Sequence, residues 1–203
     1  PYATTQYMGE GWALVGDAAA FIDPYYSPGL DHVGFSVEAT TRRVLEDARG
    51  ELGPEGIAEH NETFLRSYWR FFDSIFEGNY YMGEADLLSA AMLMDTAQYY
   101  IFVVTPAMRF LGRYHWMPVL GPKEAFFAYH LLRLYHRRFQ RLANLRSEMG
   151  EAGRRNAGRR IRAFFDLGIA PWRMGLRGAR LWLLAELDGV RLRVKRLLGL
   201  RAR

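Results

Sequence analysis

The sequence contains no cysteine. Disulfide bonds, thiolate nucleophiles and cysteine-ligated zinc or iron–sulfur centres are therefore excluded. The sequence also lacks long hydrophobic runs, since the longest uncharged stretch of its Tyr- and Phe-rich middle, Thr96 to Met108, has 13 residues. A membrane-spanning helix needs about 18–20 residues, so none is expected. Pro1 to Thr4 show neither the basic start nor the apolar core of a signal peptide, and we expect a cytoplasmic protein.

Lysine is scarce as well, because only Lys123 and Lys195 are lysines among the 27 basic residues. The charge is divided unevenly: residues 1–132 hold eight basic and 17 acidic residues, whereas residues 133–203 hold 19 basic and five acidic ones. Half of the chain is hydrophobic and 15% is aromatic, which suffices for a packed core. A length of 203 residues predicts one domain, or a domain with an appendage.

The chain is predicted to start with one buried strand and to continue almost wholly as helices. Gly11–Gly16 is a short apolar run between glycines, typical of a buried strand, and a loop follows at residues 17–27. Pro28 favours a helix start, and one apolar face continues to Gly50. Further helices are predicted at 54–83, at 84–105, and from 121 to beyond 139. Because one strand cannot form a sheet, its partners are expected upstream, in a longer protein.

The C-terminal third changes character. Residues 150–160 carry three glycines, four arginines and no large apolar side chain, so they are predicted to be a linker. Residues 161–203 are predicted to be a basic amphipathic helical tail. Its apolar stripe is Leu176, Leu183, Leu187, Val190, Val194 and Leu197. The predicted organisation is thus the end of an α/β domain (1–49), a helical cap or substrate region (50–149), the linker and the tail.

Residues 16–30 hold the pattern that carries chemistry. The predicted strand ends in Gly16-Asp17, small residues follow, and Pro28-Gly29 leads into a helix. Small residues let a flat ligand approach the backbone, and the carboxylate accepts hydrogen bonds from sugar-type hydroxyls. The first N–H groups of a helix favour negative charge nearby. The pattern indicates a cofactor with a polyol chain and a ring that becomes anionic on reduction; the alternative is a generic junction in which Asp17 caps a turn.

The string Gly-Asp-Ala-Ala-x-Phe-Ile-Asp-Pro-x-x-Ser-x-Gly resembles the second FAD-binding motif of the flavoprotein monooxygenases, and is most similar to their flavin-dependent (tryptophan-type) halogenase branch. The resemblance covers residues 11–49 and implies the C-terminal end of a Rossmann-like α/β FAD-binding domain, so that the chain is mostly α. It implies that Asp17 binds the ribityl chain, while Gly29 and Leu30 lie beside the pyrimidine edge of the isoalloxazine. The cofactor-binding residues implied are Gly16, Asp17, Ala18, Pro24, Ser27, Pro28, Gly29 and Leu30.

The resemblance implies an FAD-dependent oxidoreductase that acts on a small organic substrate. Since no Gly-x-Gly-x-x-Gly is present, the ADP site and the catalytic residues are expected upstream, and the chain alone is expected to be inactive. Halogenases are thought to hold halide on the Ser-x-Gly amides, and Pro28 has no N–H, so general flavin chemistry is favoured over halogenation. Two alternatives stay open: a membrane-associated FAD-dependent lipid or isoprenoid reductase, and a non-catalytic helical interaction module with a relic flavin motif.

Other features allow two interpretations each. His32 follows the motif and could serve as an acid or base near the ring, but a solvent-facing or capping role is favoured. The histidines show no ligand spacing, so no metal site is expected. The aromatic residues between 68 and 102 predict core packing, with a substrate pocket as the alternative. The basic tail is predicted to dock on its own chain or a second subunit, with peripheral contact to the inner face of the membrane as the alternative, and no nucleic-acid motif accompanies it.

Overall fold

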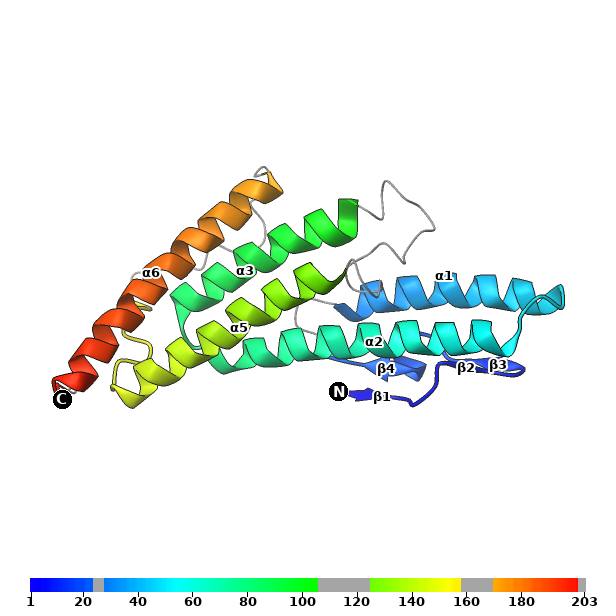
Figure 1. The fold of residues 1–203 in the computed structure, drawn as a ribbon, viewed down its shortest axis with the longest axis horizontal. Helices are drawn as coiled ribbons and strands as arrows, with labels where there is room; N and C mark the ends of the chain where they lie inside the picture. The colour runs from blue at the N-terminus through cyan, green and yellow to red at the C-terminus, as the bar shows by residue number, and fades with distance from the viewer. Residues whose placement is uncertain (24–27, 106–124, 158–169, 201–203) are drawn as a thin grey trace. The chain divides into compact units, whose positions relative to one another are not determined.

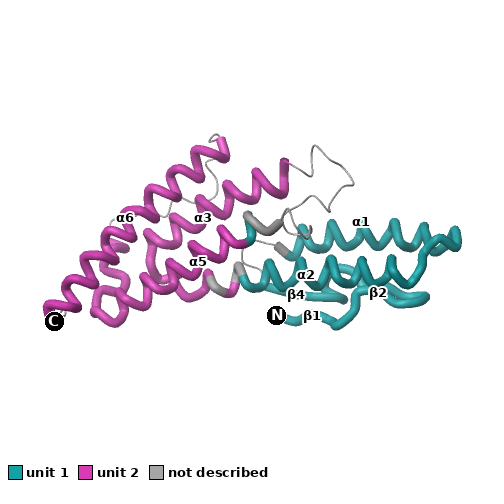
Figure 2. Tube along the Cα trace, viewed as in Figure 1, with its two compact units in different colours: residues 1–75, 110–129 teal, residues 76–109, 130–203 magenta. Residues whose placement is uncertain are grey.

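Figure 1 shows the computed structural model of the chain, which describes residues 1–23, 28–105, 125–157 and 170–200. The chain divides into two compact units (Figure 2). Unit 1 contains residues 1–75 and 110–129, and unit 2 contains residues 76–109 and 130–203. The described residues are mostly helical, as the sequence predicted. The functional division of the chain at residues 49, 149 and 160 stays a prediction.

Proline and glycine mark where the first helices begin and end. Helix α1 spans Pro28–Ala48, and Gly50 just beyond it has a φ of +70°. Helix α2 spans Pro54–Gly78, so proline is the first residue of both helices, where its missing N–H needs no partner. The two helices lie side by side in Figure 1, joined by an ion pair between Arg43 and Glu59.

The strands differ from the prediction. The described residues contain four two-residue strands: β1 (Tyr2–Ala3), β2 (Met8–Gly9), β3 (Trp12–Ala13) and β4 (Ala20–Phe21). They form two antiparallel pairs, β1 with β4 and β2 with β3. The predicted buried strand at 11–16 is wrong, because only Trp12–Ala13 is extended and paired and the Trp12 side chain is 45% exposed. The expected single strand is also wrong, and no Rossmann-type parallel sheet is seen among the described residues.

The first strands pack against α2 through one asparagine. The side-chain carbonyl of Asn61 accepts hydrogen bonds from the backbone N–H groups of Tyr7 (2.6 Å) and Met8 (2.9 Å). Its amide donates to the carbonyl of Met8 at 2.9 Å. Asn61 thus satisfies backbone groups that a neighbouring strand would otherwise pair. Beneath it, Tyr7 and Phe64 stack in the interior of unit 1.

Helix α1 turns its polar face inward. The apolar positions Leu30, Val37 and Val44 are 75%, 43% and 53% exposed. The buried positions are His32, Ser36 and Thr40, which are spaced four residues apart along the helix. Of the face that the sequence marks on α1, Leu30, Val37 and Val44 are therefore exposed in unit 1, whereas Thr40 is buried.

Unit 2 is built on α3 (Ala85–Tyr99), α5 (Ala125–Glu148, from His130 onward) and α6 (Pro171–Leu197). A 3-10 turn, Asn79–Tyr81, precedes α3, and a π-helical turn, Tyr100–Val104, follows it. Together α3 and the π turn fill the range predicted as one helix. The core is Tyr81, Leu87, Ala90, Ala91, Met94, Tyr135, Phe139, Leu142, Ala143 and Ala185.

Helix α6 docks on α3 through small residues. Gly178 lies so close to α3 that an added Cβ would overlap the Met94 side chain and stand 3.0 Å from the Ala90 carbonyl oxygen. Ala185 and Leu192, on the same face, are buried. The apolar stripe predicted to dock is exposed instead: Leu176, Leu183, Leu187, Val190, Val194 and Leu197 are 49–87% accessible. The prediction identified an apolar face, but a second face makes the contact.

A buried ionic network, centred on Arg146, joins the three helices of unit 2. The Arg146 guanidinium, 1% exposed, donates to Asp86 at 2.7 and 2.8 Å, to Glu84 at 2.8 Å and to Asp188 at 3.2 Å. Burial by itself lowers the pKa of Arg146, but hydrogen bonds and charge from Asp86 and Glu84 raise it above its usual value. A buried guanidinium with three carboxylates fixes how α3, α5 and α6 pack.

The segment predicted as a linker is tied to the same network. Asn156 accepts from the Ala85 N–H at 2.8 Å and donates to the Gly83 carbonyl at 2.7 Å. The Gly153 N–H donates to Glu84 at 2.8 Å. Glu151 is buried, and hydrogen bonds from Arg191 and Lys195 lower its pKa to about 2. Residues 150–157 therefore cap the start of α3.

Within the part of the chain that the structure describes, one segment, Ala85–Val104, is long and apolar enough to cross a membrane when judged by length and composition alone. The core helix of a soluble protein passes the same test. In unit 2 this segment packs against α6 and carries Asp86, whose carboxylate binds Arg146.

Candidate cofactor site

The Gly-Asp-Ala sequence forms a 3-10 turn, η1 (Gly16–Ala18), that rests on α1. Val15 before it is extended, and the Ala19 N–H donates to the Gly16 carbonyl at 3.0 Å. Gly16 has a φ of +56°, which residues other than glycine rarely adopt, and an added Cβ would lie 3.1 Å from the Val33 side chain. Its N–H donates to Ser36 Oγ at 3.3 Å. Glycine at position 16 thus allows the turn to lie against the helix.

The turn presents the Asp17 carboxylate outward. The Asp17 backbone carbonyl accepts from the Tyr2 hydroxyl at 2.5 Å, which holds the residue from the side of β1. Its side chain is exposed and makes no hydrogen bond or ion pair with other described residues. A carboxylate on a rigid turn with no partner of its own can accept hydrogen bonds from a ligand. Ala18 beside it is also exposed, while Ala19 is buried.

The other half of the predicted site is the start of α1. Pro28 is the first helical residue, so the next N–H groups, those of Gly29 and Leu30, have no partner within the helix. A Cβ added at Gly29 would meet nothing within 4 Å, and the Leu30 side chain is 75% exposed. Pro24 and Ser27 lie outside the described residues.

These features fit the FAD contacts that the sequence implied. Asp17 offers an unengaged acceptor for ribityl hydroxyls, and Gly29 leaves room for a flat ring beside helix N–H groups. The structure brings η1 against α1 through Gly16, Val33 and Ser36. The assignment of the individual residues to FAD stays a prediction.

His32 is buried rather than solvent-facing, with only 2% of its surface exposed. Its Nε2 lies 2.9 Å from the Tyr7 hydroxyl, and its ring is edge-on to Phe64. Burial lowers the pKa of His32 to about 4 and raises the pKa of Tyr7. The ring is therefore neutral near pH 7, and its buried Nδ1 has no hydrogen-bond partner among the described residues.

Unit 2 contains a series of hydrogen-bonded polar side chains that the sequence analysis did not predict. The Tyr81 hydroxyl bonds His136 Nδ1, and His136 Nε2 lies 3.1 Å from Asp95. The Tyr135 hydroxyl also bonds Asp95 and receives a hydrogen bond from Gln98 at 2.9 Å. Burial and the Asp95 carboxylate raise the pKa of Tyr135 well above its usual value. These residues come from separate elements, so no sequence spacing could have linked them.

This series of hydrogen-bonded side chains lies in the core of unit 2, where it joins the helices and does not face a substrate. Tyr81 and Tyr135 are 2% and 0% exposed, and both pack edge-on or tilted against Phe139 in the core. The aromatic residues therefore divide: Tyr68 and Tyr81 are core residues as predicted, whereas Trp69 and Phe76 are 55% and 45% exposed. No group of three or more histidine, aspartate or glutamate side chains that could hold a metal lies within the described ranges.

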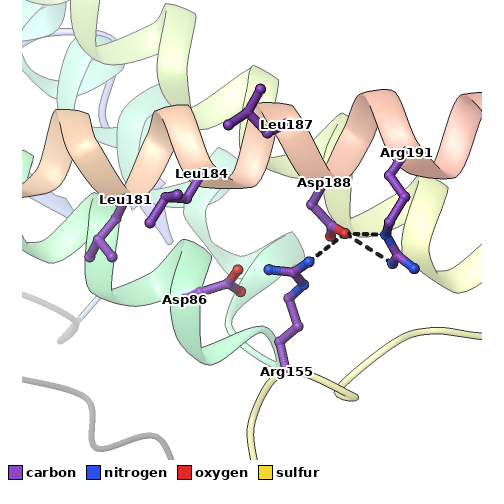
Figure 3. A pocket seen from close by; sticks show the side chains of 7 residues that line it. All are labelled: Asp86, Arg155, Leu181, Leu184, Leu187, Asp188 and Arg191. Carbon is purple, nitrogen blue, oxygen red and sulfur yellow. Dashed lines mark hydrogen bonds and ion pairs between the residues drawn. The ribbon is translucent and has the colours of Figure 1, made fainter.

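A pocket of about 370 Å³ opens on α6 in unit 2 (Figure 3). It is lined by leucines of α6 and by charged side chains from α3, α6 and the segment 150–157. The lining residues are Asp86, Arg155, Leu181, Leu184, Leu187, Asp188 and Arg191. Its ionic groups are engaged with each other: Asp188 binds Arg155 at 2.6 Å and Arg191 at 2.9 Å, and Asp86 binds Arg146. The charged side chains that line this pocket are therefore already paired.

Comparison with known proteins points to one class, the flavin-dependent halogenases, and confirms the resemblance seen in the sequence. The chain is 24% identical over 121 residues to the flavin-dependent halogenase chlA of Dictyostelium discoideum, which covers 58% of this chain and 19% of that protein. It is 35% identical over 74 residues to the flavin-dependent halogenase armH1 of Armillaria mellea, which covers 34% of this chain and 14% of that protein. The chain thus spans under a fifth of the length of these relatives. No family model and no solved structure matches it.

Proposed function

We propose that the chain is the C-terminal part of an FAD-dependent oxidoreductase of the monooxygenase and halogenase type, and that it contributes the ribityl and isoalloxazine contacts of the flavin. The observation that carries the proposal is the η1 turn, which holds an unengaged Asp17 carboxylate beside α1. Similarity to two flavin-dependent halogenases supports it.

In this proposal Asp17 accepts hydrogen bonds from the ribityl hydroxyls, and the N–H groups at the start of α1 stabilise negative charge on the pyrimidine edge of the ring. FAD, when bound, supplies the redox chemistry, while the protein orients it and tunes its charge. Pro28 offers no N–H for a halide, so hydroxylation or another flavin oxidation is the favoured reaction. The ADP half of FAD and the catalytic groups would come from other parts of the protein.

The test is the flavin content of the protein expressed from its complete reading frame. Asp17→Ala is expected to weaken FAD binding by about 10–100-fold, because hydrogen bonds to a charged acceptor are worth about 1.5–3 kcal/mol. The matched control is Asp47→Ala, an exposed aspartate near the other end of α1. The readout is the flavin-to-protein ratio after gel filtration, taken from the visible absorbance.

A second pair of variants tests the ring contact. Gly29→Ala adds a methyl group that meets no atom within 4 Å, so the fold should tolerate it while a ring at this position should not. Gly34→Ala in the same helix has equally open surroundings and should retain FAD. Flavin content that is unchanged in both Asp17→Ala and Gly29→Ala would remove the cofactor assignment and favour the non-catalytic interaction module.

A membrane-associated FAD-dependent lipid reductase is the second candidate. The exposed apolar residues of α6 favour it, since they form a surface that could contact the membrane in which a lipid substrate resides. Activity that rises with anionic liposomes would support this candidate over a soluble monooxygenase.

A further inference from the structure

Helix α6 has a second apolar face that the bundle does not use. It consists of Leu176, Leu183, Leu187, Val190, Val194 and Leu197, here called the leucine face. These residues are spaced three, four or seven apart, so they lie along one side of the helix over about 30 Å. Each is 49–87% exposed, whereas Gly178, Ala185 and Leu192 on the opposite side are buried in unit 2.

Such a face is unusual for a surface that meets only water. Soluble monomers rarely expose a continuous apolar patch larger than a few hundred Å². Trp172, on the same side near the start of α6, is 57% exposed, and Leu198 and Leu200 just beyond its end are 66% and 56% exposed. The length and continuity of the patch indicate an interaction surface.

Arginine predominates among the charges around the leucine face. Arg173, Arg177 and Arg180 are exposed and border it along one edge. The two acidic residues of α6 are both paired: Glu186, whose side chain is 27% exposed, receives hydrogen bonds from Arg138 at 2.5 and 2.6 Å, and Asp188 is buried against Arg146. The exposed side of α6 therefore presents leucine and arginine together, and its partly exposed carboxylate, that of Glu186, is paired with Arg138.

We propose that the leucine face binds the surface of a bilayer that contains anionic phospholipid, with α6 lying parallel to that surface. Leucine and valine side chains enter the boundary between headgroups and acyl chains, and the arginines bind the phosphate groups. Tryptophan suits the same interface, because its ring is amphipathic. The inference uses only unit 2 and is independent of the flavin proposal.

A second copy of the chain fits the surface less well. In an antiparallel twofold pair of α6 helices, the arginine border of one helix would face the same border of the other, and like charges repel. Nucleic acid would engage the arginines but leave the leucine face exposed to water. An anionic bilayer satisfies both components.

The test is cosedimentation of the protein, expressed from its complete reading frame, with two kinds of vesicle. One is pure phosphatidylcholine, and the other contains phosphatidylcholine and phosphatidylserine in a ratio of about 7 to 3. We expect binding to the anionic vesicles to be at least about tenfold tighter and to weaken with added salt.

A pair of double variants tests whether vesicle binding depends on the leucine face in particular or on any exposed apolar residues. Leu183→Gln with Leu187→Gln is expected to weaken binding to anionic vesicles by about tenfold or more. Both side chains are exposed, so the helical circular dichroism should be unchanged. The matched control, Val44→Gln with Leu45→Gln, alters two equally exposed apolar residues of α1 and should bind as the unmodified protein does.

Arg177→Gln with Arg180→Gln should abolish the preference for phosphatidylserine. Equal binding to both vesicle types, or unchanged binding after Leu183→Gln with Leu187→Gln, would overturn the proposal. A dimer that dissociates on the leucine substitutions, without vesicle binding, would assign the surface to a second copy instead. Flavin content measured on the same samples keeps this outcome distinct from that of the cofactor site.

Discussion

In unit 1 the buried polar side chains are neutral hydrogen-bonding groups, whereas in unit 2 several of them are charged and pair with one another. The buried polar residues of unit 1 are His32, Ser36, Thr40, His60 and Ser67. Those of unit 2 include Glu84, Asp86, Arg146, Glu151 and Asp188. A neutral group needs one or two partners of modest geometry, but a buried charge needs a matching charge and nearly complete hydrogen bonding.

The two kinds of interior have different structural roles. The neutral interior of unit 1 supports η1 and the start of α1, where the candidate cofactor residues face open space. The charged interior of unit 2 fixes α3, α5 and α6 and leaves the leucine face exposed. Variants that disturb each kind of interior should therefore have different magnitudes and different pH dependences.

The largest expected effect is the loss of the buried cation of unit 2. Arg146→Met leaves Glu84, Asp86 and Asp188 without their shared partner, so the free energy of unfolding should fall by about 3–5 kcal/mol. Arg138→Met is the control, because Arg138 also binds an acidic residue of α6 but is about a quarter exposed, and about 1 kcal/mol is expected. Urea titration of both variants gives the comparison. Equal losses would show that burial does not distinguish the two pairs.

The next effect is the pH dependence of unit 1. Burial lowers the pKa values of His32 and His60 from 6.5 to about 4, with the charge of Arg43 adding to the effect at His60. Between pH 6.5 and 4 the unfolded chain therefore binds protons that the folded unit does not. Stability falls on acidification through this window by up to about 1.4 kcal/mol per pH unit for each histidine.

Urea unfolding at pH 7, 6 and 5 measures this slope, and His32→Gln with His60→Gln should reduce it. His130→Gln, which replaces an exposed histidine of unit 2, is the control and should leave it in place. The contrasting group in unit 2 is Glu151, whose pKa falls from 4.5 to about 2. Its contribution is complete above pH 4.5 and is lost between pH 4.5 and 2. A double variant with an unchanged slope would contradict the neutral-interior account.

The sequence predicted the helices where proline and glycine mark them. Pro28 and Gly50 bracket α1, and Pro54 begins α2, because these residues constrain the backbone locally. The short strands left no signal. Two residues show no periodicity, and the backbone of Met8 in β2 is bound by Asn61, which lies more than 50 positions away.

The choice of buried face could not be predicted from hydrophobicity. On α6 the large apolar residues drew attention to the leucine face, but close helix packing selects small residues such as Gly178 and Ala185. On α1 the interior position of His32 depends on Tyr7, a residue that precedes the motif. At the candidate site, the helix start at Pro28 follows the pattern, whereas residues 16–18 form a 3-10 turn where the end of a buried strand was expected. Their role toward FAD awaits the flavin measurement.

The smallest expected effect tests how closely α3 and α6 must approach to form the ionic network. Gly178→Ala places a methyl group against Met94 and 3.0 Å from the Ala90 carbonyl oxygen, so the helices must separate. Such overpacking costs about 1–3 kcal/mol, offset by the roughly 0.5–1 kcal/mol that alanine gains over glycine in a helix.

Gly175→Ala, one turn earlier, meets only the Ala97 Cβ at 3.6 Å and should raise stability by about 0.5–1 kcal/mol. The two variants therefore differ in sign although the substitution is the same. Thermal unfolding of both proteins measures the difference. If Gly178→Ala is stabilising too, α6 can shift on α3 without loss of stability. The ionic network around Arg146 then does not require the close approach of these two helices.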